Sequence, residues 1–565
     1  MKVPERRGQT LRMVAFSATL GVVGGIAALV FDTLVQLAQH FFLGKFAETP
    51  PLSIEQALHL TTWPEVAHRW WLPAVTTLGG LLSGVLVYSL APEAEGHGTD
   101  AVVKAYHRGG GYIRARIPWV KGLASAITIG SGGSAGREGP TAQIVAGLGA
   151  SVGQLAKLPV TTRRQLLLIG TAAGLSAVFQ SPLGAAVFAV EVLYSGVAFE
   201  SGALLLAFIA AAVAYAVHGL FVGFQPIFVI PRDITFQQPA ELSVFAALGI
   251  AAGMLGALLP IVFYGVRDAF HRIPLPNHVK PAIGGFLLGL LGLLLPEVLG
   301  GGYGVIQLVL DGAAGASLGL LCALALGKVV ALSLTVGSGG SGGVFAPSLF
   351  VGALLGAASA RVALAADVPA NPTALAVVGM AAVFAAAGRV PMANLIMVTE
   401  MTGGYGLIVP TMLAVSLAYL TQALLTRRAR YSTLYEAQVE SASESHAHHE
   451  EYYRATASLL RRRQVRLEED ILRREFVEAL ARGLPIPLGS GNEELFTVKV
   501  APGSQLDDTL LRDLRLDVVV VSVIRGQTER IPRGDTALRA GDTLVVAGHP
   551  EGIAAFRELS LAQPT

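Results

Sequence analysis

An arginine and a glutamate stand side by side, at Arg137 and Glu138, inside a glycine-rich stretch of an otherwise apolar region. The stretch reads Thr128-Ile-Gly-Ser-Gly-Gly-Ser-Ala-Gly-Arg-Glu-Gly-Pro140. A helix that restarts after such a break has unpaired amide groups at its first turn, which carry about half a positive charge and favour an anion. A buried carboxylate next to that helix start predicts a site that handles anions.

The glycine-rich stretch occurs twice. The second copy, Thr335-Val-Gly-Ser-Gly-Gly-Ser-Gly-Gly-Val-Phe-Ala-Pro347, has the same length but carries Val344 and Phe345 where the first copy has its charged pair. For a single copy, close packing of helices through small residues is the favoured interpretation. The duplication, with an acid in one copy only, favours a transport site built from interrupted helices in two related halves. Neither copy has the Gly-Lys-Ser/Thr ending of a nucleotide-binding loop.

The composition places most of the chain in a membrane. Of its 565 residues 53% are hydrophobic and only 14% are charged, and the mean hydropathy is +0.58. A formal net charge of +2 gives no sign of a nucleic-acid partner, and the lone Cys322 excludes a disulfide framework. The membrane segments show no nucleophile and base pair and no metal-ligand cluster, so we expect neither an enzyme nor a cofactor.

The basic residues indicate the orientation in the membrane. Lys2, Arg6, Arg7 and Arg12 precede an apolar run over about residues 13–43, which is too long for the core of a signal peptide. A second basic group, Arg427, Arg428 and Arg430, follows the last apolar segment. By the positive-inside rule both ends of the membrane part are expected to face the cytoplasm.

The repeat extends beyond the glycine-rich stretches. Lys121 and Lys328 precede the two copies at the same offset, and Glu191 is echoed by Glu400. Gly96-His-Gly98 is echoed more loosely by Gly302-Tyr-Gly304. The membrane region therefore divides into halves of about 13–225 and 242–440. Several segments fall short of the roughly 20 residues that a crossing needs, so tilted and half-spanning helices are expected.

Four parts of the chain follow from these patterns. We predict a cytoplasmic N-terminus over 1–12, a membrane domain over 13–440, a helical cytoplasmic linker over 441–493 and a small α/β module over 494–565. For the module the alternation of apolar residues predicts strands at 496–501, 518–524 and 543–548 and a helix at 552–559. In the linker, His446, His448 and His449 favour a solvated segment over a metal site.

The membrane region resembles the CLC family of chloride channels and chloride/proton antiporters. The residues that carry the resemblance are Gly136, Arg137, Gly139 and Pro140 around Glu138 in one signature, and Gly343 and Pro347 around Val344 and Phe345 in a second. The tail is similar to TrkA-C regulatory domains, through Ile531-Pro-Arg-Gly-Asp535 and Gly541-Asp-Thr-Leu-Val-Val546. The implied fold is a mainly α membrane protein, an inverted repeat of broken and tilted helices with a small cytoplasmic α/β domain.

The resemblance also implies a function. Members are homodimers with an anion pathway in each subunit, and they carry chloride, related anions and in some cases protons. Glu138 takes the position of the gating glutamate, and the backbone amides of Val344 and Phe345 that of anion ligands. A bacterial plasma (inner) membrane is the implied location, and the tail is expected to bind a small ligand or a cation.

Three positions depart from the family or leave alternatives open. His97, followed by Gly98, stands where the family has an anion-binding serine; it either donates to the anion or turns aside to a backbone carbonyl. The anion-binding tyrosine is either Tyr435, which we prefer, or Tyr431. Val192 occupies the position of the inner proton glutamate, an arrangement seen in passive channels.

The leading hypothesis is chloride/proton exchange gated by Glu138. Passive chloride conduction is the alternative, because Val192 cannot carry a proton. A fluoride exporter of the same fold is disfavoured by the intact Gly136 to Pro140 signature and by Phe345. A sensor in which the tail binds a ligand and the membrane part is vestigial is disfavoured by the intact glycine stretches.

Overall fold

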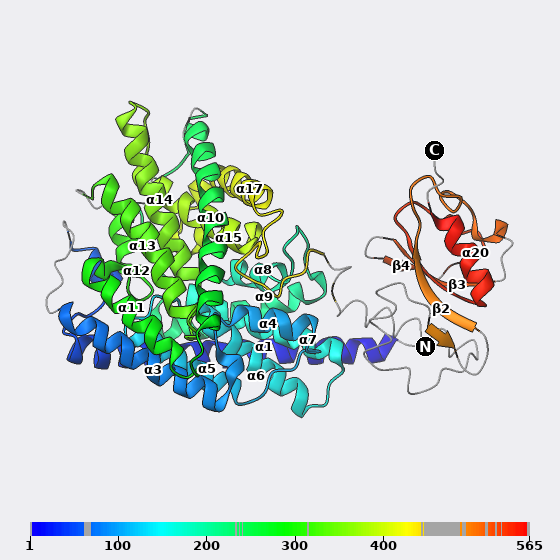
Figure 1. Cartoon of the computed structure of the whole chain (residues 1–565), viewed down its shortest axis with the longest axis horizontal. Coiled ribbons are helices and arrows are strands. Elements are labelled where there is room, and N and C mark those ends of the chain that lie inside the picture. Colours follow the sequence, from blue (N-terminus) through cyan, green and yellow to red (C-terminus); the bar gives the residue numbers. More distant parts are fainter. Residues whose placement is uncertain are drawn as a thin grey trace. The chain divides into compact units, whose positions relative to one another are not determined.

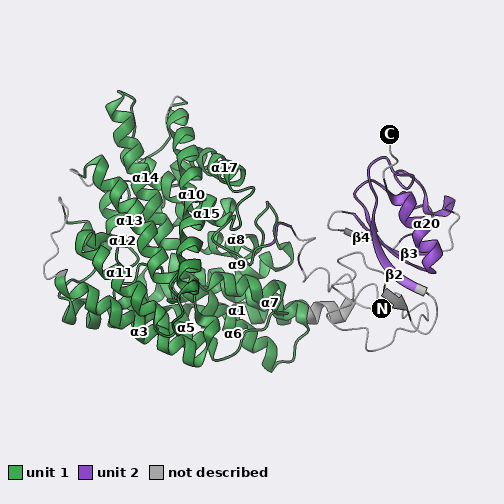
Figure 2. Ribbon diagram, viewed as in Figure 1, with its two compact units in different colours: residues 1–438 green, residues 439–565 purple. Residues whose placement is uncertain are grey.

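The computed structural model describes the chain as two compact units, residues 1–438 and residues 439–565 (Figure 2). The helix predicted within the linker and the three linker histidines lie outside the described residues. The described residues are 3–60, 69–231, 234–236, 238–239, 241–312, 316–441, 445, 486–488, 493–514, 518–525, 528–530, 532 and 534–561.

In the first unit the described elements are helices joined by loops. Its first half contains α1 (Val3–Gln39), the π-helical turn η1 (His40–Phe46), α2 (Ile54–Ala57), η2 (Arg69–Trp71), α3 (Leu72–Leu90), η3 (Pro92–Ala94), α4 (Thr99–His107), α5 (Ile117–Gly130), α6 (Glu138–Leu155), α7 (Val160–Phe179), α8 (Pro182–Glu191) and α9 (Ser201–Val222). Its second half contains α10 (Glu241–Arg272), α11 (Lys280–Leu294), η4 (Pro296–Val298), α12 (Tyr303–Leu310), α13 (Leu318–Val336), α14 (Phe345–Ala365), α15 (Pro372–Gly388), α16 (Pro391–Thr402), η5 (Tyr405–Leu407) and α17 (Ile408–Leu425).

These helices are those of a membrane protein. Among the described residues, seven helices are long and apolar enough to cross a bilayer, and α8, α11 and α15 are apolar but shorter. The predicted mixture of spanning and half-spanning helices is therefore confirmed. Within this unit the helices of the first half (blue to cyan) gather on one side and many of those of the second half (green to yellow) on the other (Figure 1).

Two buried lysines show how the halves correspond. The Lys121 ammonium on α5 donates to the carbonyls of Ala94 and Gly96, at 3.0 and 2.6 Å. The Lys328 ammonium on α13 donates to the carbonyls of Val298 and Gly300, at 2.9 and 2.7 Å. Each lysine thereby satisfies carbonyl groups at the end of a short 3-10 helix, η3 or η4, and in the glycine segment that follows it.

The lysine contacts correct one detail of the sequence repeat. They pair Gly96 with Gly300, so the looser echo of Gly96-His-Gly98 in Gly302-Tyr-Gly304 is out of register by two residues. Gly98 precedes α4 and Gly302 precedes α12, both with positive φ, at +86° and +81°. The counterpart of Tyr303 in the first half is therefore Thr99 and not His97.

The short helices α8 and α16 cap each other. The Glu191 carboxylate, at the end of α8, accepts from the amides of Met392 and Ala393 at the start of α16, at 3.1 and 2.7 Å. The Glu400 carboxylate, near the end of α16, accepts from the Gly184 amide of α8 and from the Ser181 hydroxyl before it, at 2.9 and 2.5 Å. Each acid satisfies amide groups that have no partner inside their own helix.

The second unit is a small mixed domain. Its strands are β1 (Ile486–Leu488), β2 (Glu493–Lys499), β3 (Val518–Arg525), β4 (Thr528–Arg530) and β5 (Thr543–Gly548), and they form one antiparallel sheet in the order β1-β2-β5-β3-β4. The helix α20 (Pro550–Ser560) contributes Ile553 and Phe556 to the core. The three predicted strands and the helix are present. The edge strands β1 and β4, with three residues each, were not predicted, because three residues are too few to show an alternation.

A half-buried ion pair joins the end of β3 to the loop that precedes β5. The Arg525 guanidinium donates to both carboxylate oxygens of Asp542, at 2.8 and 2.7 Å, and the Arg539 amide donates to one of them at 2.9 Å. Burial raises the pKa of Asp542, but these hydrogen bonds outweigh it and hold the pKa below its ordinary value. Because the folded pKa is depressed, this contribution to stability is lost as the pH falls through it.

The mutual capping of α8 and α16 makes a prediction about stability. We expect Glu400→Ala to lower the free energy of unfolding by about 1 to 3 kcal/mol, because the amides and the hydroxyl that it binds lose their acceptor. The measurement is the unfolding temperature of the purified protein in detergent. As a control, Glu55→Ala removes an exposed carboxylate and should leave that temperature unchanged. Equal temperatures for the two variants would contradict the capping role.

Candidate functional site

The two glycine-rich stretches meet at one point. The Gly136 amide donates to the Gly343 carbonyl at 2.8 Å, and the Gly343 amide donates to the Gly136 carbonyl at 2.6 Å. This is a two-residue antiparallel bridge between equivalent positions of the two halves. Since each residue gives and accepts one bond, an approximate two-fold axis passes between them. Glu138 and Phe345, the first residues of α6 and α14, stand at equivalent positions on the two sides of this axis.

The Glu138 side chain is buried at this junction, with 1% of its surface exposed. Its Oε1 atom accepts a hydrogen bond from the Tyr303 hydroxyl on α12. Its Oε2 atom lies where a Cβ atom on Gly136 would stand, and close to Gly343. Only glycine at position 136 leaves room for the carboxylate in this position.

Three helix starts surround the carboxylate. α6 and α14 begin beside the bridge, and α4 comes close because Gly98 and Gly139 pack backbone against backbone. A Cβ atom on Gly98 would stand 2.5 Å from the Gly139 carbonyl oxygen. The first-turn amides of these helices have no partner within their own helix, and those of Val344 and Phe345 stand at the start of α14. Such a cluster of amide groups is suited to an anion.

His97 and Tyr435 lie together beside α4. Their ring centroids are 5.3 Å apart, edge to face, and both side chains are buried. The Tyr435 ring also approaches Phe384, which packs on Phe345 with a centroid distance of 4.4 Å. His97, Phe345 and Tyr435 therefore belong to one aromatic cluster.

The other candidate tyrosine lies elsewhere. Tyr431 stacks on Tyr264 at 4.3 Å, and its hydroxyl accepts from the Arg267 guanidinium at 3.0 Å. Among the described residues, no hydrogen bond joins the His97 ring to a backbone carbonyl. Its Nδ1 atom instead accepts from the Asp100 amide, at 3.4 Å.

Val192 follows the last residue of α8 and is buried. Its carbonyl accepts from the Gln438 side-chain amide at 3.0 Å. At the same turn the His107 Nε2 atom lies 2.9 Å from the Leu193 carbonyl oxygen. The neighbouring acid, Glu191, is engaged in capping α16. The side chain at the position that we identified as lacking a proton carrier is thus apolar and buried, whereas the backbone of this turn contacts the polar side chains of Gln438 and His107.

A chain of polar contacts leads from Glu138 to α1 and α9. The Arg137 guanidinium lies over the Tyr303 ring, 5.2 Å from its centroid, and forms an ion pair with Asp32 at 3.0 Å. The His218 Nε2 atom is 3.6 Å from the other carboxylate oxygen of Asp32. Asp32, Arg137 and His218 line a cavity of about 1010 Å³.

Three residues in this series of polar contacts were given no role from the sequence: Tyr303, Asp32 and His218. Asp32 carries a signal that could have been used, because a carboxylate inside a long apolar run usually has a functional partner. Tyr303 lies in the Gly302-Tyr-Gly304 motif of the repeat, but the motif does not show which residue the ring reaches. His218 carries no signal in the sequence, because its role depends on a contact with Asp32, far away in the sequence.

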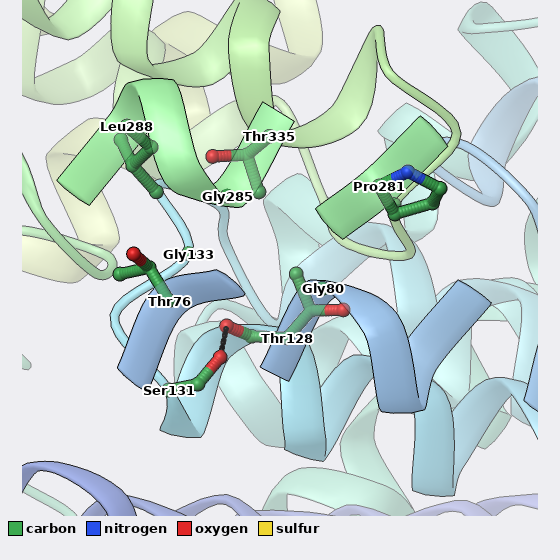
Figure 3. Close-up of a pocket in the computed structure, with 10 residues that line it drawn as sticks. Thr76, Gly80, Thr128, Ser131, Gly133, Pro281, Gly285, Leu288 and Thr335 are labelled. Atoms are coloured by element: carbon green, nitrogen blue, oxygen red, sulfur yellow. Dashed lines mark hydrogen bonds between the residues drawn. The ribbon is translucent and has the colours of Figure 1, made fainter. Parts of the chain in front are cut away.

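A second, smaller cavity lies on another side of the glycine-rich stretches (Figure 3). The hydroxyl-bearing residues Thr76, Thr128, Ser131 and Thr335 surround it, and its volume of about 10 Å³ is that of one water molecule at most. The Ser131 hydroxyl donates to the Thr128 carbonyl at 3.1 Å. This cavity is too small to hold an anion.

Comparisons with known proteins match both units of the chain. The family model of voltage gated chloride channels matches residues 79–423, and that of the TrkA-C domain matches residues 495–561. A ClcB-like protein of Ralstonia nicotianae is 32% identical over 419 residues, which cover 72% of this chain and 93% of the relative. The H(+)/Cl(-) exchange transporter ClcA of Citrobacter koseri is 30% identical over 439 residues, which cover 76% and 89%.

Solved structures show the same fold for the membrane unit. A slow cyanobacterial Cl−/H+ antiporter aligns with a TM-score of 0.63 at 22% identity, covering 74% of this chain and 96% of the other. A CLC-type fluoride/proton antiporter aligns with a TM-score of 0.63 at 23% identity, covering 77% and 98%. The predicted inverted repeat of broken helices with a TrkA-C domain is thereby confirmed as the fold.

The close approach of Glu138 to Gly136 makes a prediction about anion binding. In Gly136→Ala the new methyl group takes the place of the carboxylate, whose flexible side chain must move away. If the ionised carboxylate competes with chloride for the amide cluster, chloride should bind several-fold more tightly to this variant, and calorimetric titration of purified protein measures this. Gly122→Ala, where a Cβ atom meets only ordinary contacts, is the control. Unchanged chloride affinity in Gly136→Ala would contradict the competition.

Proposed function

The chain belongs to the voltage gated chloride channel (CLC) family, and on that premise we propose that it exchanges chloride for protons, with Glu138 coupling the two ions. The observation that carries this proposal is the place of the Glu138 carboxylate, buried at the bridge where α6 and α14 begin. The name of the ClcA relative, an H(+)/Cl(-) exchange transporter, supports the same reaction.

The proposed coupling follows from charge. The ionised carboxylate is a tethered anion that occupies the amide cluster and keeps chloride out. A proton neutralises the carboxylate, which then has less reason to stay among partial positive charges and swings away. Chloride enters the vacated place, and its departure goes with the return of the ionised side chain. Each passage of anion is thereby linked to one protonation of Glu138.

The proposed anion ligands are the amides of Val344 and Phe345, the His97 ring and the Tyr435 hydroxyl. Because the His97 Nδ1 atom accepts from the Asp100 amide, the ring proton of the neutral form is on Nε2. That N–H group is able to donate to an anion in the same way as the serine hydroxyl that His97 replaces. Gly98 and Gly139 let the backbone of this segment approach the start of α6.

Passive chloride conduction is the second candidate, and Val192 is the observation that favours it. An exchanger has to bring protons to Glu138 from the other side of the membrane, and a buried valine offers no group for this. In exchange, the proton would have to reach Glu138 by water or by another titratable side chain. Glu138 itself favours exchange, because a channel without proton movement has no need of a titratable group at the anion site.

The remaining proposals concern the setting. We propose chloride and not fluoride as the main substrate, because the signature around Glu138 is intact and Phe345 is present. We further propose a homodimer in a bacterial inner membrane, with both termini in the cytoplasm. The TrkA-C domain is proposed to regulate transport by binding a small ligand or a cation, in place of the alternative in which the whole protein is only a sensor.

Glu138→Gln tests the coupling. The amide mimics the protonated carboxyl group, so we expect chloride flux to persist and proton movement to be abolished. Both ions are followed in liposomes that hold the purified variant, with the unmodified protein in parallel. Proton uptake that is the same in the variant and in the unmodified protein would rule out Glu138 as the coupling group.

His97→Ser tests the anion ligand. The hydroxyl restores the donor of the family but is smaller than the imidazole ring, so both the donor and the space around the anion change. We expect the ratio of chloride to nitrate flux to change at least two-fold. Identical ratios for both proteins would show that His97 has only a structural role.

A further inference from the structure

Tyr303 reaches the gating position from the opposite half of the protein. It is the first residue of α12, and its hydroxyl donates to the Oε1 atom of Glu138, 165 positions away in the sequence. Its counterpart in the first half is Thr99, at the start of α4. The two halves therefore differ here, because only the second half provides a ring long enough to reach the carboxylate.

The Tyr303 ring is held in place on more than one side. Phe228 stacks on it with a centroid distance of 5.9 Å and an angle of 22° between the ring planes. The Arg137 guanidinium lies over the ring, and its ion pair with Asp32 fixes the guanidinium. A hydroxyl whose ring is packed in this way is a directed donor and not a mobile one.

Among the described residues, no side chain other than Tyr303 donates a hydrogen bond to the Glu138 carboxylate. The Oε2 atom has no side-chain hydrogen-bond partner there, and Arg137 donates to Asp32 and not to the carboxylate. The backbone amides of Glu138 and Ala346 also interact with the carboxylate, but neither Tyr303→Phe nor Tyr405→Phe changes them. The charged and titratable groups that face Glu138 are Arg137, Tyr303 and Tyr435, with Asp32 and His218 behind Arg137.

We propose that Tyr303 is a positioning residue, a latch that holds the ionised Glu138 side chain in the anion pathway. The inference rests on the proposed gating role of Glu138. A hydrogen bond from a hydroxyl to a carboxylate is stronger than one to a neutral carboxyl group. The latch therefore favours the closed, ionised state over the open, protonated state, and it sets how acidic the solution must be before the gate opens.

The test is the pH profile of chloride flux in liposomes for Tyr303→Phe. Phenylalanine keeps the ring and its stacking and removes only the hydroxyl. Without the donor the ionised state is less stable relative to the protonated one, so protonation occurs at higher pH. We expect the pH of half-maximal flux to rise by about one unit, the shift that corresponds to one charge-assisted hydrogen bond. Flux at neutral pH should rise as well.

Two controls separate the latch from a general effect. Tyr405→Phe removes the hydroxyl of an exposed tyrosine on η5 and should leave the profile unchanged. Tyr303→Phe combined with Glu138→Gln should behave as Glu138→Gln alone, because a neutral amide has no ionised state to be latched. A further shift in the double variant would overturn the proposal, since Tyr303 would then act through another group.

The outcomes distinguish this proposal from the proposed function. If Glu138→Gln removes the pH dependence of flux but Tyr303→Phe does not shift it, the latch is wrong and the gate stands. If Glu138→Gln leaves the pH profile unchanged, the gating role fails, and the latch fails with it.

A second variant covers the case in which Tyr303→Phe does not fold. Phe228→Leu loosens the Tyr303 ring and keeps its hydroxyl, so it should shift the pH profile in the same direction by less. An unchanged profile would overturn the latch.

Discussion

Backbone amides and carbonyls inside a membrane need a partner, because no water is there to replace it. This chain interrupts its helices twice at equivalent positions and so exposes such groups in both halves. The two interruptions satisfy each other through the bridge between Gly136 and Gly343. Lys121 and Lys328 satisfy the carbonyls of the adjoining stretches. The starts of α4, α6 and α14 lie close to this bridge, and there we propose the anion site.

The proposed gate depends on a difference between the two halves. At equivalent positions one half has Glu138 and the other has Phe345, so one acid faces amides that both halves provide. The missing side chain of Gly136 makes the room for that acid. Tyr303 contributes the hydroxyl that meets it. A symmetric pair of glutamates would place two negative charges in the same pocket, and a symmetric pair of phenylalanines would leave nothing to titrate.

Local patterns in the sequence were enough to predict the helices and the two halves, and they led to Glu138 as the proposed gating residue. The helix α3 ends where its apolar run ends, and Glu138 lies in a signature that is contiguous in the sequence. Other features depend on packing that no local pattern reports. The contact of Tyr303 with Glu138, the pairing of Arg137 with Asp32 and the capping by Glu191 each join residues about 100 to 200 positions apart. The repeat around His97 was misaligned by two residues because short glycine motifs align equally well in more than one register.

Proton movement that is driven by a chloride gradient, without a proton gradient at the start, is the most direct test of exchange. Liposomes holding the unmodified protein are loaded with chloride, placed in a low-chloride medium at the same pH, and the membrane voltage is held constant with a potassium ionophore. The account predicts that chloride efflux drives protons into the liposomes and that the medium becomes more alkaline. Chloride efflux without any proton uptake would contradict exchange and would make the protein a passive conductor, with Val192 as the structural reason.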